Sequence, residues 1–366
     1  MTAVALGLPT RRVAQPATWN PREPAPVDGP LVDTFGRVAR DLRVSVTDRC
    51  NLRCTYCMPA EGLDWMDTAD VLTTEEMVRI LTVAVRDLGI ERIRFTGGEP
   101  LLRRDLEEII ARVAGLPQRP EIAMTTNGLG LTRRAQGLVD AGLSRINVSL
   151  DTVDAQRFAE ITRRDRLDDV LAGLAAAHAA GLDPVKVNAV LADHTDLARL
   201  PDLLEYCLRH GYELRIIEQM PLDADHAWVR GQMVTADEIL ATLRGTFDLH
   251  DDPAPRGSAP AATWIVGGRR TASGKPARVG VIASVTRPFC GDCDRTRLTA
   301  DGSLRNCLFA ETETDLRSAL RTLPDHEIDA AIADSWRANA WAKAAGHSVN
   351  TAGFRQPSRP MSAIGG

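Results

Sequence analysis

The sequence predicts an α/β fold in which a partial barrel of six βα units precedes a smaller α+β region. Short apolar or alternating runs typical of strands recur between residues 42 and 218, and stretches with helical periodicity separate them. Six such units in succession are typical of a parallel sheet that curls toward a barrel. The Pro-rich stretch DDPAPRGSAP (residues 251–260) then marks a change to a different pattern of elements.

The elements of the partial barrel are expected to alternate along the chain. The expected strands are LRVSVT, RIRFT, EIAMTT, RINVSLD, VKVNAVL and ELRIIE. Several of the expected helices end at glycine, which helix C-termini favour. These helices span 73–89, 103–115, 132–142, 167–181, 196–210 and 235–245.

The region after the Pro-rich stretch has its own set of expected elements. TWIVG and RVGVIAS are expected strands, and RLTADGSLRN is an expected hairpin with Asp301-Gly302 as its turn. Two helices follow, near 312–322 and 325–344. We therefore divide the chain into residues 1–32, 33–250 and 251–366. The first segment, with six prolines and no hydrophobic period, is predicted to be an arm outside the barrel.

Composition excludes two classes of partner. The chain has 366 residues, 44% hydrophobic content and a net charge of -5, so it carries no overall basic field for nucleic acid. Its apolar runs are shorter than the roughly 18 residues that a membrane span needs. We expect a cytoplasmic protein that binds neither nucleic acid nor membrane.

Polar residues alternate with apolar ones along the expected strands. Parallel strands that are covered on both faces normally have continuous apolar sequences. Because helices must cover the apolar face, we expect the polar face to point into the barrel. A lumen that contains Arg43, Arg94, Lys186 and Arg215 would suit a strongly anionic small molecule. The alternative for any one of these residues is a side chain that snorkels to the surface.

Six of the seven cysteines form two groups of three. Cys207, the exception, shares a helical face with leucines and is predicted to be a buried core thiol. The first group is Cys50, Cys54 and Cys57, in CNLRCTYC directly after the first expected strand. Structural zinc sites are closed by four ligands, so three thiolates are a poor zinc set. A four-iron cubane held by three thiolates keeps one iron open for a substrate or cofactor.

These residues carry a resemblance to a known superfamily. CNLRCTYC resembles the C-x3-C-x2-C signature of the radical S-adenosylmethionine (SAM) enzymes, and FTGGEPLL is similar to their glycine-rich segment. The resemblance implies a partial barrel of radical SAM type, with a [4Fe-4S] cluster at the three cysteines and SAM on its open iron. In that superfamily an electron from the cluster splits SAM, and the resulting 5′-deoxyadenosyl radical abstracts a substrate hydrogen.

The second cysteine group narrows the resemblance. FCGDCDRTRLTADGSLRNCLF contains Cys290, Cys293 and Cys307, and its alternative interpretation is a zinc knuckle with a borrowed ligand. Together with TTNG, VSLD, KVNAV, MPLD and the terminal Gly365-Gly366, this stretch resembles the GTP 3′,8-cyclase family of molybdenum cofactor biosynthesis. The resemblance runs from about residue 33 to the end of the chain. It implies a lyase with a second [4Fe-4S] cluster, which converts GTP to 3′,8-cyclo-7,8-dihydro-GTP.

The resemblance also implies roles for individual residues. No side chain is expected to act as a catalytic acid or base, because the radical arises from SAM at the first cluster. The double-glycine tail is expected to reach toward the active site, where only glycine is slim enough to fit. The residues implied for SAM are Tyr56, Gly98, Ser149 and Met220; those for GTP are Arg43, Arg94, Thr125 and Lys186, with Arg215 on the same face, and Arg295, Thr296 and Arg297 on the guanine side.

The resemblance implies three protein partners as well. They are a one-electron donor such as a flavodoxin or ferredoxin, a second copy of the chain in a homodimer, and the cyclic pyranopterin monophosphate synthase as a possible recipient of the product. Two other functions stay open at this point. One is another radical SAM enzyme with an auxiliary cluster, although peptide-modifying members usually carry more C-terminal cysteines. The other is a non-catalytic zinc-binding protein, which would leave the GGEP segment without a role.

Overall fold

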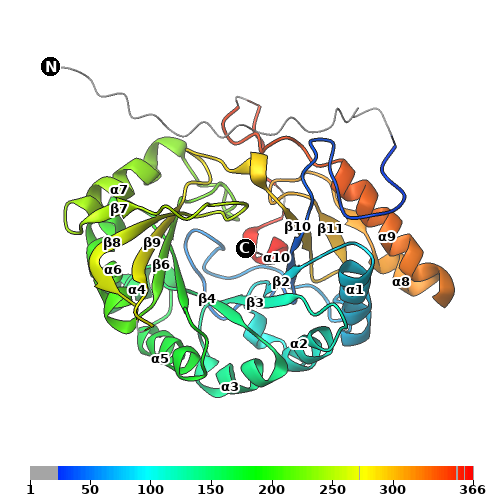
Figure 1. Ribbon diagram of the computed structural model, residues 1–366, viewed down its shortest axis with the longest axis horizontal. Coiled ribbons are helices and arrows are strands. Elements are labelled where there is room, and N and C mark those ends of the chain that lie inside the picture. The colour runs from blue at the N-terminus through cyan, green and yellow to red at the C-terminus, as the bar shows by residue number, and fades with distance from the viewer. Residues whose placement is uncertain (1–23, 272, 352, 358, 366) are drawn as a thin grey trace.

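A single curved sheet organises the chain, with helices around its outer face (Figure 1). The computed structural model describes residues 24–271, 273–351, 353–357 and 359–365. Six parallel strands form the centre of the sheet in chain order. They are β1 (Asp41–Ser45), β2 (Arg92–Thr96), β3 (Glu121–Thr126), β4 (Arg145–Ser149), β5 (Lys186–Val190) and β6 (Glu213–Ile217). The sheet remains open, which confirms the predicted partial barrel.

Helices connect these strands and cover the outside of the sheet (Figure 1). Capping boxes at Thr73 and Thr235 begin the first and last of them, and both side chains accept the backbone N–H three residues on. The helices are α1 (Thr74–Arg86), α2 (Leu106–Ala114), α3 (Leu131–Ala141), α4 (Ala155–Thr162), α5 (Leu167–Ala179), α6 (His194–His210) and α7 (Ala236–Arg244). The sequence analysis missed α4, whose eight residues give too short a period to recognise.

The strands after residue 245 extend the same sheet at both of its edges. β9 (Pro276–Ile282) runs parallel to β6, and β8 (Ala262–Arg270) and β7 (Leu249–Asp251) follow it outward. At the other edge β10 (Arg295–Leu298) runs parallel to β1. The predicted hairpin joins β10 to β11 (Ser303–Arg305) through Asp301-Gly302, and β12 (Thr314–Asp315) completes this edge. The chain after residue 250 therefore shares a sheet with the barrel, and a domain boundary there stays a prediction.

Three helices complete the C-terminal part of the chain. α8 (Arg317–Thr322) and α9 (Asp325–Trp341) lie beside the β10–β12 edge (Figure 1). The short α10 (Met361–Ile364) lies at the centre of the molecule, inside the curve of the sheet. The C-terminal segment therefore enters the barrel that the first half of the chain builds.

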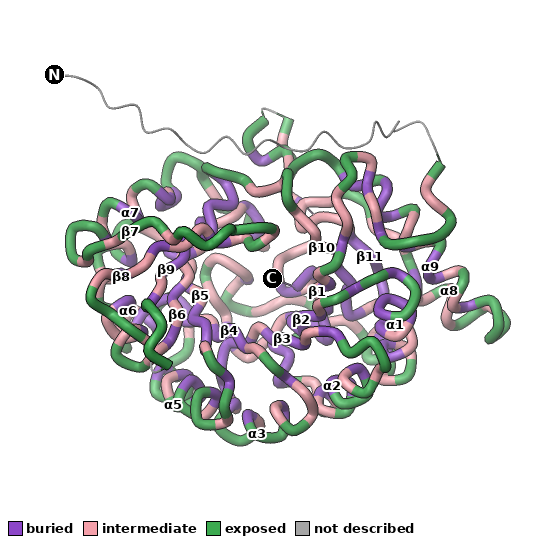
Figure 2. Tube along the Cα trace, in the orientation of Figure 1, coloured by how far each residue is buried: buried purple, intermediate pink, exposed green. Residues whose placement is uncertain are grey.

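Alternation along the strands separates a core from a lumen. Leu42, Val44, Ile93 and Phe95 are fully buried in one hydrophobic cluster with the apolar faces of the helices. Figure 2 shows this buried material along the strands, with exposed residues mainly on the outer helices and loops. Cys207 is fully buried in the same cluster, as predicted. The polar neighbours of these residues are left on the inner face, where they can meet a ligand.

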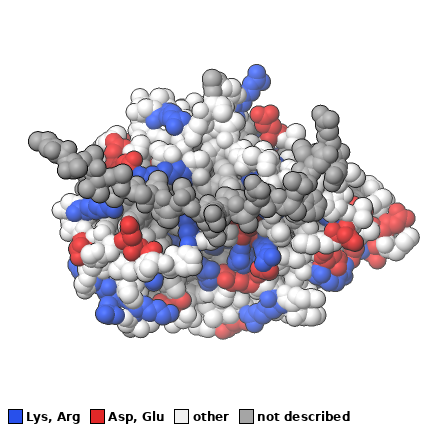
Figure 3. All heavy atoms as spheres, turned by 45° about the horizontal axis from the view of Figure 1, so that its top comes forward, with Lys and Arg blue, Asp and Glu red and all other residues white. Residues whose placement is uncertain are grey.

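The surface carries charges of both signs, in agreement with the small net charge of the chain (Figure 3). Lysine and arginine side chains are interspersed with aspartate and glutamate on the face shown in Figure 3. No helix among the described residues is long and apolar enough to cross a membrane. Residues 1–23 of the predicted N-terminal arm lie outside the described part of the chain. Its last residues pack on the body, since Leu31 is fully buried and its carbonyl accepts the Ala39 N–H at 2.8 Å.

Candidate active site

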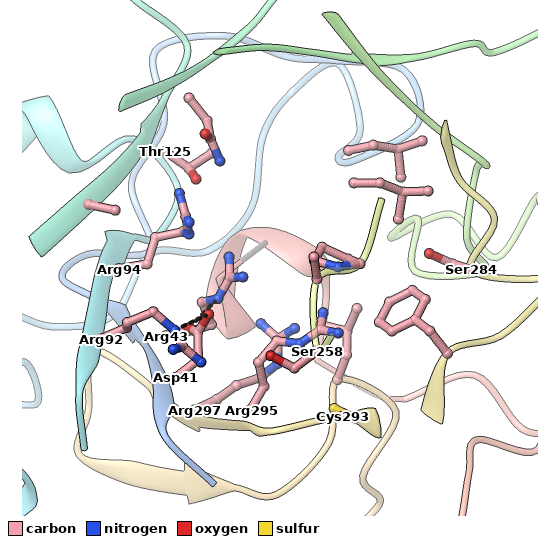
Figure 4. A pocket seen from close by; sticks show the side chains of 18 of the residues that line it. Asp41, Arg43, Arg92, Arg94, Thr125, Ser258, Ser284, Cys293, Arg295 and Arg297 are labelled. Carbon is pink, nitrogen blue, oxygen red and sulfur yellow. Dashed lines mark hydrogen bonds and ion pairs between the residues drawn. The ribbon is translucent and has the colours of Figure 1, made fainter. Parts of the chain in front are cut away.

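A cavity of about 550 Å³ fills the inside of the curved sheet (Figure 4). Inward side chains of β1 to β6 form one wall, and segments of the C-terminal region form the other. The strand residues on this wall include Asp41, Arg43, Arg92, Arg94, Thr125, Arg145, Asn147, Asn188 and Arg215. The structure confirms the predicted polar lumen, because these are the alternating residues of the strands.

Five of the arginines that line the cavity were singled out from the sequence: Arg43, Arg94, Arg215, Arg295 and Arg297. Burial lowers the pKa of Arg94 well below its ordinary value, and the positive charge of Arg43 lowers it further. Burial, with help from Arg43 and Arg295, lowers the pKa of Arg297 to about 9. Burying several positive charges close together raises the free energy of the folded protein, unless an anion binds among them. The cavity is therefore built for a ligand with several negative charges.

Acidic side chains orient some of these cations. Asp41 accepts a hydrogen bond from Arg43 Nε at 3.0 Å, which Figure 4 marks. Glu213 accepts from Arg215 Nε at 3.0 Å and from Lys186 Nζ at 3.1 Å. Arg94, Arg295 and Arg297 have no carboxylate partner among the described residues. No described carboxylate neutralises these guanidinium groups, so they can donate hydrogen bonds to an anionic ligand.

Two of the residues predicted for GTP do not line the cavity. Lys186 lies at the start of β5, where its ammonium group is buried beside Glu213. Thr296 lies on the outer face of β10, because its hydroxyl accepts the indole N–H of the fully buried Trp336 at 3.0 Å. Thr125 does line the cavity, at the end toward the first cysteine group.

The first cysteine group lies in the loop after β1. Burial raises the pKa of Cys50, Cys54 and Cys57, that of Cys57 to about 12, and neighbouring thiolates of the group raise the pKa of Cys54 and Cys57 further. One short loop brings the three half-buried sulfurs together, and this arrangement fits an iron–sulfur core, which would bind them deprotonated. Asn127 Nδ2 lies 3.8 Å from Cys50 Sγ, and the backbone N–H of Ser362 donates to Cys57. Hydrogen bonds of this kind tune such clusters.

Two of the residues predicted for SAM, Tyr56 and Gly98, lie at this loop. Tyr56 donates its hydroxyl proton to Asp151 at 2.8 Å, just beyond the Ser149 end of β4. A Cβ on Gly98 would lie 2.3 Å from the carbonyl oxygen of Arg49, so the glycine allows the GGEP segment to pack on the cysteine loop. Met220 lines the cavity itself.

The second cysteine group lines the cavity itself. Cys290, Cys293 and Cys307 all line it, next to the start of β10. Lys343 Nζ lies 3.4 Å from Cys293 Sγ. Burial raises the pKa of the Cys293 thiol, but Arg295 and Lys343 outweigh it and lower the pKa below its ordinary value. This environment favours a thiolate, the form that binds iron.

The C-terminal tail lies between the first cysteine group and the cavity. Met361 lines the cavity and Ser362 contacts Cys57, while the carbonyl of Gly365 accepts a hydrogen bond from Arg297 NH1. Gly365 has φ +83°, and a Cβ there would lie 2.7 Å from Thr96 Cγ2. The tail thus enters the barrel as predicted as far as Gly365. Gly366 lies outside the described residues.

Sequence analysis missed the loop between β7 and β8 as part of the site. Arg256, Ser258 and Pro260 line the cavity, although their Pro-rich stretch was interpreted only as a boundary. The ring of Phe289 lies between two guanidinium groups, 5.3 Å from Arg256 and 4.6 Å from Arg295. No motif marks this loop. The loop lies over the cavity because β8 and β9 extend the sheet beyond β6.

Comparisons with known proteins identify the family. The family model described as Radical SAM superfamily matches residues 44–207, and the model described as Molybdenum Cofactor Synthesis C matches residues 212–349. GTP 3′,8-cyclases of Mycobacterium sp. (strain KMS) and Mycolicibacterium smegmatis are each 61% identical to this chain, with all of both chains covered. The chain belongs to the GTP 3′,8-cyclase family. A relative named GTP 3′,8-cyclase 2, from Mycobacterium tuberculosis (strain H37Rv), is 58% identical over the same full length.

Solved structures support the fold of this family member. Streptococcus suis SuiB bound to S-adenosylmethionine matches with a TM-score of 0.53 at 12% identity, covering 88% of this chain and 76% of SuiB. SuiB bound to its precursor peptide SuiA matches with a TM-score of 0.54 at 11% identity, covering 88% and 74%. At this identity the likeness shows the architecture alone. In the family member the same architecture surrounds an arginine-rich cavity that the second cysteine group lines.

Proposed function

We propose that this chain converts GTP to 3′,8-cyclo-7,8-dihydro-GTP, the first step of molybdenum cofactor biosynthesis. Full-length relatives with that activity in their names support the proposal. The single observation that carries it is the cavity, which is lined by several arginines and by the second group of three cysteines, while the first group contacts the C-terminal tail that enters the barrel. A triphosphate and a purine at opposite ends of one cavity would use both features.

The two cysteine groups would each hold a [4Fe-4S] cluster. Cys50, Cys54 and Cys57 would hold the first, beside SAM at Tyr56, Gly98, Ser149 and Met220. Cys290, Cys293 and Cys307 would hold the second. When bound, the first cluster with SAM supplies the deoxyadenosyl radical that removes the ribose 3′ hydrogen.

The chain's own residues bind and orient GTP. Arg43, Arg94 and Arg215 present forked donors that match phosphate oxygens, and Thr125 adds a hydroxyl near the SAM end. Arg295 and Arg297, next to the second cysteine group, would hold the guanine side, with the backbone of Thr296 between them. This placement would hold C8 of the base close to C3′ of the ribose. The rate of an intramolecular ring closure depends above all on how closely the two reacting atoms are held. The tail and the β7–β8 loop limit access of water.

A radical SAM enzyme for another substrate is less well supported. SuiB has been solved with its precursor peptide SuiA bound, whereas the cavity of the present chain is lined by arginines. The proposed enzyme also needs a one-electron donor, for which we propose a flavodoxin or ferredoxin. A homodimer and transfer of product to the cyclic pyranopterin monophosphate synthase stay predictions.

An assay with labelled substrate tests the proposal. The reconstituted chain is incubated without oxygen with SAM, dithionite and GTP that carries deuterium at C3′. We expect cyclised product and a 5′-deoxyadenosine that contains one deuterium. Deuterium-free 5′-deoxyadenosine with intact GTP would contradict the proposed reaction.

The pH dependence of GTP use tests Lys186. Burial lowers the pKa of Lys186 to about 8, with a further contribution from Arg215, so the side chain is charged below that pH and neutral above it. If its charge supports the triphosphate, the KM for GTP should stay level below pH 8 and rise by up to about tenfold per pH unit above it. Lys186→Arg keeps its charge at these pH values and should remove this rise. Identical KM profiles for the parent chain and Lys186→Arg would exclude the role.

A further inference from the structure

A second hollow lies on the outer surface, beside the first cysteine group. It has a volume of about 490 Å³ and lies outside the lumen of the barrel. Its lining comes from the cysteine loop, the segment after β2, the start of α3 and the segment between α4 and α5. None of the cavity residues described above belongs to it.

The hollow is linked to Cys50 by a short chain of side chains. Asn51 lines it and directly follows Cys50 in the sequence. Asn51 Oδ1 accepts a hydrogen bond from Asn127 Nδ2 at 2.7 Å, and the same Asn127 nitrogen lies 3.8 Å from Cys50 Sγ. The surface of the hollow and the first cluster are therefore separated by about two side chains.

The rim of the hollow is positively charged. Arg133, Arg134, Arg164 and Arg166 line it together with a single carboxylate, Asp165. Arg134 pairs with Glu107 and Arg166 with Asp169. Arg133 and Arg164 are exposed, and neither takes part in an ion pair within the described ranges. The N-termini of α3 and α5 also lie at this rim and add positive partial charge.

The floor of the hollow is apolar. Leu101, Leu102 and Leu129 line it, and Leu102 is 42% exposed, one of few large apolar side chains so exposed among the described residues. A small anion would use the arginines but would gain nothing from exposed leucine. An apolar centre with a charged rim is instead typical of a protein–protein interface.

We propose that this hollow is the docking surface for an acidic one-electron carrier protein that reduces the first cluster. The proposal rests on the proposed function, which requires such a reduction. One electron passes from the reduced carrier to the cluster, so that the carrier is oxidised by one electron and the cluster reduced by one, with no bond made or broken. Complementary charge would orient the carrier, and the leucines would exclude water at the contact.

Binding of an acidic flavodoxin to the reconstituted protein tests the surface directly. The test variant is Arg133→Glu with Arg164→Glu, and the matched control is Arg244→Glu with Lys275→Glu, two exposed cations that line neither the hollow nor the cavity. We expect the test variant to raise the Kd of flavodoxin by about tenfold at low salt. The difference from the parent should shrink as salt is added. Equal affinities for the test and control variants would overturn the proposal.

A comparison of reductants separates docking from damage to the cluster. With reduced flavodoxin, the test variant should form 5′-deoxyadenosine from SAM about tenfold more slowly than the control. With dithionite, which needs no docking surface, the two should be equally fast. An equal loss with both reductants would mean that the arginines support the cluster loop, and would contradict the proposal. If the parent cleaves SAM but does not cyclise GTP, the proposed function fails while docking is still measured.

Discussion

Replacing Cys290 with serine is expected to stop formation of the cyclised nucleotide while SAM cleavage continues. Cys290 lines the cavity where GTP would lie, whereas the first cysteine group lies outside the lining of that cavity. A hydroxyl is a poor substitute for a thiolate on iron. Loss of hydrogen bonds around metal ligands already costs 10-fold to 100-fold, so loss of a ligand should lower the rate of product formation by more than about 100-fold.

The measurement is product and 5′-deoxyadenosine in the same reaction, with dithionite as the reductant. Cys207→Ala is the matched control, because Cys207 is fully buried in the core and belongs to neither group. The control should keep both products. Parent-like cyclisation by Cys290→Ser would show that the second group has no part in the chemistry.

Replacing Gly365 with valine is expected to cause the second large loss. Gly365 has φ +83°, a conformation that a β-branched residue strongly disfavours. A Cβ there would also lie 2.7 Å from Thr96 Cγ2 and 3.3 Å from Ser45 Cβ. The tail must move, and Arg297 then loses the carbonyl that it contacts. Displacement of an arginine at the guanine end should lower kcat by about 100-fold.

Gly353→Val provides the control for this variant. Gly353 lies on the same C-terminal segment, has no atom within 4 Å of a built Cβ, and is exposed. Its variant should keep the parent's kcat. A parent-like kcat for Gly365→Val would mean that the tail is not needed in the cavity.

The sequence was sufficient for the barrel and for the inner face of its strands. Strands such as RIRFT and EIAMTT occur at the predicted residues because apolar side chains alternate with polar ones along them, and the two kinds face opposite sides of the sheet. Arg43, Arg94 and Arg215 were placed in the lumen by the same alternation. The two cysteine groups were found by spacing alone, because their ligands lie close together in the sequence.

What the sequence did not reveal depends on contacts between distant segments. Which strands pair at the edges of a sheet depends on the tertiary fold. No local sequence pattern therefore predicted that β10 pairs with β1 or that β9 pairs with β6. No local pattern predicted the contact between Arg256 and Phe289 either, because the fold brings these two segments together at the cavity. Thr296 faces α9 because neighbouring residues of a strand point to opposite faces, and Arg295 and Arg297 take the inner one.

The most direct test of the account is the iron and acid-labile sulfide content of the anaerobically reconstituted chain, with zinc measured alongside. The account predicts about eight irons and eight sulfides per chain, and about four of each in Cys290→Ser, because each cysteine group would hold one cubane. About four irons in the parent chain, or zinc without sulfide, would contradict the claim that each cysteine group holds a cluster.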